Sequence, residues 1–124
     1  MPLVYDVDET QQLVRSVGTG SLTVSELRDY FAATRADPRV RSTMHRLMDL
    51  SGITDLPSSA EIRSMAAMSL DWRPDPAARI AVIAASDVTY GVSMMFGGYA
   101  GYRDQLAVFR DEAEALAWLG VPRG

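Results

Sequence analysis

The chain has 124 residues, a formal net charge of −4 and no cysteine. Hydrophobic residues at 48% and charged residues at 23% indicate one globular domain over residues 1–124 and exclude a disordered chain. The acidic balance argues against a nucleic-acid partner, and the absence of cysteine excludes disulfides and thiolate chemistry.

The start of the chain lacks the charged and then apolar leader of a secreted protein. No apolar run approaches the ~18 residues that cross a membrane. We therefore expect a cytoplasmic protein that does not insert into a membrane.

The first predicted element is an antiparallel hairpin. Residues 3–8 alternate between apolar and polar side chains, and residues 13–17 follow after a short polar link. Strands this close in sequence pair antiparallel, and the alternation predicts a partly solvated sheet face. Residues 18–20 (GTG) predict the end of the second strand.

A helix is predicted from Thr23 to the pair Asp37-Pro38. Thr23 and Glu26 have the spacing of a capping box, and the residue before a proline disfavours helix. Side chains at helical spacing define a face toward a core, made by Leu27, Tyr30, Phe31 and Thr34.

A third strand is predicted over residues 42–50, and a loop over residues 51–56. Ser58 and Glu61 form a second capping box, which predicts the start of a helix. Residues 71–77, with two prolines, predict an extended surface connection. The buried stripe of this helix is predicted to be Ile62, Met65, Ala66, Ser69 and Leu70.

Residues 79–85 (RIAVIAA) form a continuous run that is typical of a central strand buried on both faces. A helix is predicted to follow from Ser86 or Asp87. Its broad apolar face is predicted to contain Val88, Val92, Met95, Phe96, Tyr99 and Tyr102.

A second stripe on the same helix contains Gly91, Met94, Gly98 and Gly101. Glycine within a helix costs about 1 kcal/mol relative to alanine, so these positions need an explanation. One interpretation is a frayed or kinked helix, or a loop from Gly97 onward; the other is close approach by another backbone or a ligand. An exposed stripe would predict a homodimer contact between helices.

The last strand is predicted over residues 105–109, and Asp111 then caps a helix with an acidic first turn. Gly120, Val121 and Pro122 form a helix stop. The complete order is β-β-α-β-α-β-α-β-α. It predicts an α/β fold whose mixed sheet joins the N-terminal antiparallel hairpin to parallel strands, with about four helices.

No catalytic, metal or cofactor site is predicted. The only histidine, His45, lies on the same predicted strand as Asp49, and no Gly-x-Ser-x-Gly motif supplies a serine. Asp6 and Asp8 fit a solvated strand face, and no glycine-rich phosphate loop follows a strand. We therefore expect a protein that is not an enzyme and binds no cofactor.

The most informative segment runs from Asp49 to Ala60 and contains Ser51, Ser58 and Ser59. A serine at a helix N-terminus suits phosphorylation, because backbone N–H groups and the helix dipole stabilise an added phosphate. The added charge would then switch partner binding. The alternative is that Ser58 only caps the helix.

Two family resemblances follow from these residues. Asp49-Leu50-Ser51-Gly52 resembles the strand end of the STAS signature found in anti-sigma-factor antagonists and sulfate-transporter tails. Ser58-Ser59 match its Asp-Ser-Ser-Gly phosphoacceptor turn, where Pro57 and Ala60 replace the aspartate and the glycine. Residues 79–83 and 108–119 resemble small SpoIIAA-like proteins more closely. The resemblance implies a STAS/SpoIIAA-like fold over nearly the whole chain.

Two functional hypotheses result. The first is a non-enzymatic regulatory module that binds a protein partner through the segment containing Asp49, Ser51, Ser58 and Ser59. The alternative is a carrier of a small apolar ligand or lipid between the helices that follow Ser58 and Ser86, because methionine-rich walls adapt to varied shapes. Its candidate residues, which also fit an ordinary core or an interface, are Met65, Met68, Met94, Met95, Phe96 and Tyr99.

Overall fold

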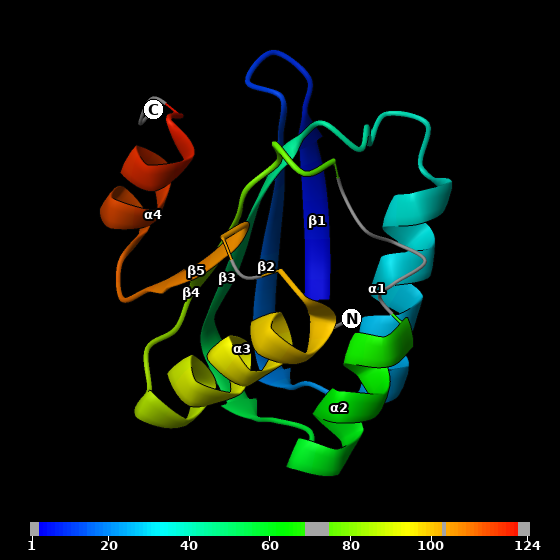
Figure 1. Cartoon of the computed structure of the whole chain (residues 1–124), viewed down its shortest axis with the longest axis vertical. Helices are drawn as coiled ribbons and strands as arrows, with labels where there is room; N and C mark the ends of the chain where they lie inside the picture. Colours follow the sequence, from blue (N-terminus) through cyan, green and yellow to red (C-terminus); the bar gives the residue numbers. More distant parts are fainter. Residues whose placement is uncertain (1–2, 69–74, 103, 122–124) are drawn as a thin grey trace.

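The computed structural model describes residues 3–68, 75–102 and 104–121, without the side chains of Met68 and Tyr99. Within these residues the elements follow the predicted order (Figure 1). They are β1 (Leu3–Asp8), β2 (Leu13–Ser21), α1 (Val24–Ala36), β3 (His45–Asp55), α2 (Ser59–Met68), β4 (Ile80–Ile83), α3 (Asp87–Ala100), β5 (Leu106–Phe109) and α4 (Glu112–Leu119).

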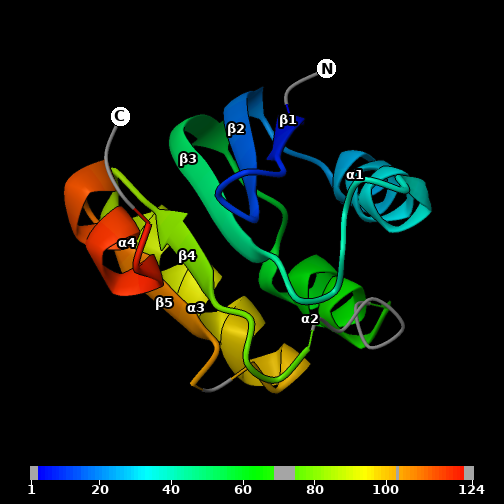
Figure 2. The ribbon, with the colours of Figure 1, turned by 90° about the horizontal axis from the view of Figure 1, so that it is seen from above.

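The strands form one mixed sheet in the order β1-β2-β3-β4-β5. β1 pairs antiparallel with β2, and each later strand adds parallel to the strand before it. Right-handed crossovers that all step in one direction place their helices on one face of the sheet. α1, α2 and α3 cover that face, and α4, which follows the last strand, covers the other (Figure 2). The predicted fold class is confirmed.

Two cores of unequal size hold the layers together. The larger lies between the sheet and α1 to α3, and the smaller lies under α4. α4 packs mainly on β3, β4 and β5 and covers only the start of β2, at Leu13, so the outer face of β1 and of the rest of β2 is largely open. Val4 and Val17, which pair across these two strands, are accordingly 54% and 45% exposed. This is the partly solvated face predicted for the hairpin.

β2 and β3 are longer than predicted. The predictions of a strand end at residues 18–20 and of a loop over residues 51–56 are wrong. β2 runs to Ser21 and β3 runs to Asp55, and the ends of the two strands pair with each other. Gly18 does not make a turn. A Cβ atom there would lie 2.9 Å from Ile53 Cδ1, so the glycine leaves room for a side chain of the neighbouring strand.

The buried face of α3 differs from the prediction. Val88 is 68% exposed, whereas Val92, Met95 and Phe96 are only partly buried. Tyr102 is buried as predicted, beyond the end of the helix. The residues that α3 turns into the protein are mostly small: Thr89, Ser93, Gly97 and Ala100. Small side chains allow the helix to approach the sheet closely.

Gly97 decides between the two interpretations of the α3 glycines. The helix continues past it to Ala100, and Gly101 then ends the helix in the left-handed conformation at φ 76°. The predicted loop from Gly97 onward is therefore wrong. A Cβ atom at Gly97 would lie 3.1 Å from Leu106 Cδ2, so close approach to β5 explains this glycine.

The predicted helix caps of α1 and α4 are present. Thr23 Oγ1 accepts a hydrogen bond from the Glu26 N–H at 3.2 Å, and Asp111 Oδ1 accepts one from the Glu114 N–H at 2.9 Å. α4 ends at Gly120, with φ 74°. These local signals explain why the helix starts were predictable.

Candidate functional site

Ser58 and Ser59 lie at the carboxyl edge of the parallel strands. β2 to β5 all end at this edge, and α1, α2 and α3 begin there (Figure 1). In open α/β sheets, ligands commonly bind at this edge. The position therefore suits a binding surface.

The capping box predicted for α2 is complete. Ser58 Oγ accepts a hydrogen bond from the Glu61 N–H at 3.2 Å, and Glu61 Oε1 accepts one from the Ser58 N–H at 3.0 Å. The two bonds with Ser58 hold the pKa of the Glu61 carboxyl below its usual value. Ser58 therefore caps α2, which is the role that the alternative interpretation of this serine predicted.

Ser59 is the first residue of α2, and it is exposed. At this position the side chain projects beside the free N–H groups of the first helical turn, where the helix dipole favours negative charge. A phosphate on Ser59 would gain this stabilisation and leave the Ser58 cap intact.

The connection before Ser58 is anchored in the core. Pro57 is buried and Leu56 is half-buried, and both contact the space between the helices and the sheet. The Leu22 N–H also donates a hydrogen bond to the Asp55 carbonyl at 2.9 Å. The N-terminus of α2 is therefore held at a defined place.

Asp49 and Ser51 lie on β3, since the strand continues through the predicted loop. The Ser51 N–H and hydroxyl both donate to Asp49 Oδ1, at 3.0 and 2.6 Å. In the described part of the chain, no hydrogen bond joins this pair to Ser58 or Ser59. The two halves of the predicted segment are separate local structures.

An apolar cavity of about 60 Å³ lies where the ligand site was predicted, between the helices and the sheet. Pockets that hold drug-sized ligands measure roughly 300–1,000 Å³, so this cavity takes only a few atoms. Met65 and Phe96 line it, whereas Met95 does not and packs, partly buried, against the larger core. Met94 is 51% exposed on the outer side of α3. Met68 and Tyr99 lie outside the described side chains.

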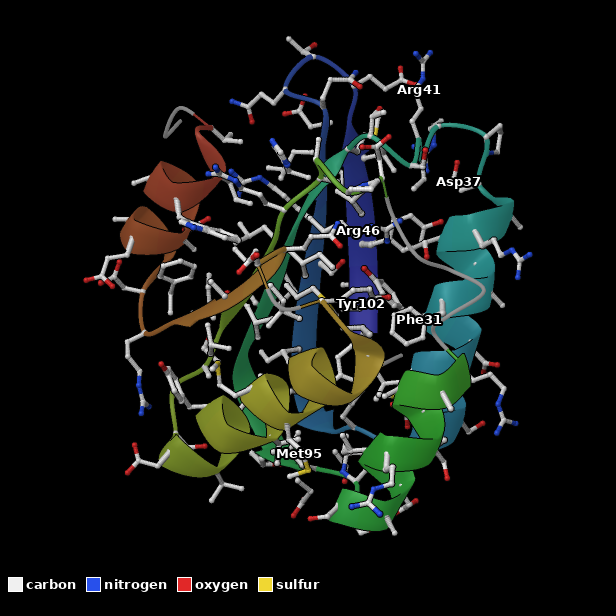
Figure 3. All side chains as sticks on the ribbon, in the orientation of Figure 1. Phe31, Asp37, Arg41, Arg46, Met95 and Tyr102 are labelled. Atoms are coloured by element: carbon white, nitrogen blue, oxygen red, sulfur yellow. The ribbon has the colours of Figure 1, made fainter. Side chains whose placement is uncertain are left out.

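Arg46 is a buried charge that the sequence analysis did not identify. It is 4% exposed and lies on the face of β3 covered by α1 to α3, near Tyr102 (Figure 3). Burial lowers the pKa of its guanidinium, whereas a hydrogen bond to Tyr30 raises it. The signal was available, because alternation along β3 places Arg46 on the same face as Met48 and Leu50.

His45 has a structural role at the start of β3. Its Nδ1 accepts a hydrogen bond from the Arg79 N–H at 2.9 Å, next to the first residue of β4. Burial, and then the charge of Arg79, lower the pKa of the imidazole below its ordinary value of 6.5. The folded protein therefore favours the neutral ring.

We expect stability to decrease as the pH falls below about 6.5. The contribution of His45 is complete above the unfolded pKa and is lost as the pH falls through the lower folded pKa. Urea unfolding at pH values above and below about 6.5 measures the loss of stability, and NMR titration of His45 gives the folded pKa. His45→Gln keeps an acceptor without titrating, so an identical pH dependence in this variant would contradict the assignment.

Among residues 3–68, 75–102 and 104–121, no group of three acidic or histidine side chains is arranged to hold a metal ion. No helix in these ranges combines the length and apolar character that a membrane crossing requires.

Neither a protein-family model nor a curated protein matches the chain. Solved structures do match it, and two of them do so over nearly their whole length. An uncharacterized protein of the DUF3478 family from Shewanella loihica PV-4, with a SpoIIAA-like fold, is 14% identical with a TM-score of 0.62, covering 94% of this chain and 93% of its own. An anti-sigma factor antagonist from Mycobacterium paratuberculosis is 13% identical with a TM-score of 0.60, covering 95% and 94%. The chain has the STAS/SpoIIAA-like fold that its sequence predicted.

Proposed function

We propose that the chain is a non-enzymatic, cytoplasmic regulatory module that binds a protein partner through the N-terminus of α2. The observation that carries the proposal is the exposed Ser59 beside Ser58, the residue that caps α2, at a helix start that the buried Pro57 anchors in the core. The similarity in fold to an anti-sigma factor antagonist supports a protein partner.

Phosphorylation of Ser59 is the proposed switch. A phosphate there adds about −1.5 to −2 charges to an exposed helix start. On Ser58, the same group would displace Glu61 from the Ser58 N–H and break the capping box. Phosphorylation of Ser59 would change the charge of the partner surface, whereas phosphorylation of Ser58 would change its shape.

Native mass spectrometry of the protein purified from its own cells tests the proposal. We expect a co-purifying protein, and a phosphate that maps to Ser59 under denaturing conditions. Ser59→Asp should change the affinity for that protein at least tenfold. Ser64→Asp, at an exposed position later in α2, is the matched control and should not change it. A chain that is always unmodified and has no partner would contradict the proposal.

A carrier of a small apolar ligand is the second candidate, favoured by the apolar lining of the cavity between α2 and α3. Any ligand larger than a few atoms requires these helices to move apart. The same denaturing spectrum tests it, since a co-purified molecule of low mass would support a carrier and a bare chain would not.

A further inference from the structure

The sheet face that carries α4 has an uncovered part over the N-terminal hairpin. Val4 and Val17 pair across β1 and β2 and are both exposed. Asp49 of β3 pairs with Val17 and continues the same row, whose far end, Ile83 and Phe109, packs under α4. Figure 2 shows α4 at the β5 side of this face, whereas no described helix lies over β1 and β2 there.

Carboxylates lie beside the two exposed valines. Asp6 and Asp8 follow Val4 at every second residue of β1, so they project from the same face of the sheet. Asp6 is exposed, and Asp8 and Asp49 are half-buried. We call Val4, Asp6, Asp8, Val17 and Asp49 the outer hairpin face. It combines exposed apolar side chains with three carboxylates.

The neighbouring arginines are bonded to other carboxylates. Arg15, which pairs with Asp6 across the strands, donates to Glu112 at 2.8 Å. The charge of Arg39 is felt from Asp6, yet the Arg39 guanidinium is held by both carboxylate oxygens of Asp37, at 3.2 and 2.9 Å. Negative charge therefore remains in excess on the outer hairpin face.

We propose that the outer hairpin face docks a basic amphipathic helix of a protein partner. Its carboxylates attract lysine and arginine side chains, and its valines give the contact an apolar centre. The same carboxylates oppose the other occupants of an open face. A second copy would bring the same acidic face and a net charge of −4, and an anionic lipid surface would be repelled.

The dimensions of the face favour a helix. Neighbouring strands lie about 4.8 Å apart, so β1 and β2 together offer a width of about 10 Å, which is the diameter of one helix. The six residues of β1 extend over about 20 Å, the length of a helix of about 13 residues. Asp6 and Asp8 lie about 7 Å apart along β1, and two basic residues four positions apart on a helix are separated by about 6 Å.

The outer hairpin face is distinct from the proposed partner surface on α2. α2 lies on the other side of the sheet, so docking here does not require Ser59 or its phosphate. Either proposal can therefore fail alone. A contact limited to one helix is at the small end of specific interfaces, and we expect dissociation in the micromolar range.

Fluorescence anisotropy with a labelled synthetic peptide and the full chain tests the proposal. The probe is a helical peptide of about 14 residues, with leucines on one face and arginines four positions apart beside them. Wild type should bind it in the micromolar range, and more weakly as the salt concentration rises. A peptide with glutamate in place of arginine, and one with serine in place of leucine, should each bind about tenfold more weakly or worse.

Variants of the chain locate the contact. Asp6→Lys and Val17→Ser, both at exposed positions, should each weaken binding of the arginine peptide about tenfold. The glutamate peptide should bind Asp6→Lys more tightly than it binds wild type. Asp29→Lys makes the same change of charge at an exposed position on α1 and is the matched control, which should bind like wild type.

Three results would overturn the proposal. They are an arginine peptide that binds Asp6→Lys as tightly as wild type, an equal loss of affinity in Asp29→Lys, and a glutamate peptide that binds wild type as tightly as the arginine peptide does. Wild type that dimerises through Val17, or that binds phosphatidylglycerol vesicles through it, would also overturn the proposal and would assign the face to a second copy or to lipid.

Discussion

Replacing Leu116 with alanine should lower the free energy of unfolding by about 2–5 kcal/mol. Leu116 is 2% exposed and belongs to the smaller core, which α4 and Val121 cover among the described residues. α4 has eight residues, so few other side chains hold it in place. The cavity left by the truncation would therefore remain largely unfilled.

Equilibrium urea unfolding measures this loss, with Val4→Ala as the control. Val4 is 54% exposed on the open part of the same face, so its truncation should cost less than about 1 kcal/mol. A loss for Leu116→Ala no greater than that of the control would show that α4 contributes little to stability.

Replacing Tyr30 with phenylalanine should cost about 1–3 kcal/mol, although the ring and its packing are kept. The Tyr30 hydroxyl lies 2.5 Å from Ser16 Oγ, and both residues are buried. It also hydrogen-bonds the buried Arg46. Removing the Tyr30 hydroxyl leaves the Ser16 hydroxyl and the Arg46 guanidinium each with one hydrogen-bond partner fewer. Both groups are buried, so water does not replace the lost partner.

A double-mutant cycle with Ser16→Ala separates this network from simple packing. The double variant should lose less than the sum of the two single losses, because the Ser16–Tyr30 bond is counted in both. Tyr90→Phe is the control, because it also removes a tyrosine hydroxyl, but from a ring that packs against Arg110 instead of Ser16 and Arg46. The Tyr90 ring centre lies 4.9 Å from the Arg110 guanidinium carbon, and this contact is kept in the variant. Strictly additive losses would show that the hydroxyls act independently.

The candidate site was predictable where its signals are local. The spacing of Ser58 and Glu61 was sufficient to place the start of α2, because a capping box joins residues three positions apart. The separation of Asp49 and Ser51 from that helix start was not predictable. It depends on β2, which pairs with residues 52–55 and extends β3.

By itself, the sequence determined the order of the elements, the helix caps and the mixed sheet, since capping spacing and apolar periodicity act over a few residues. The tertiary structure alone decided the ends of β2 and β3, the side of α3 that is buried, and the burial of Arg46. Gly18 shows the reason. Glycine is a residue typical of turns, yet Gly18 lies within a strand because Ile53, distant in sequence, fills the space beside it. Which distant side chains compete for the same volume is settled only when the layers pack.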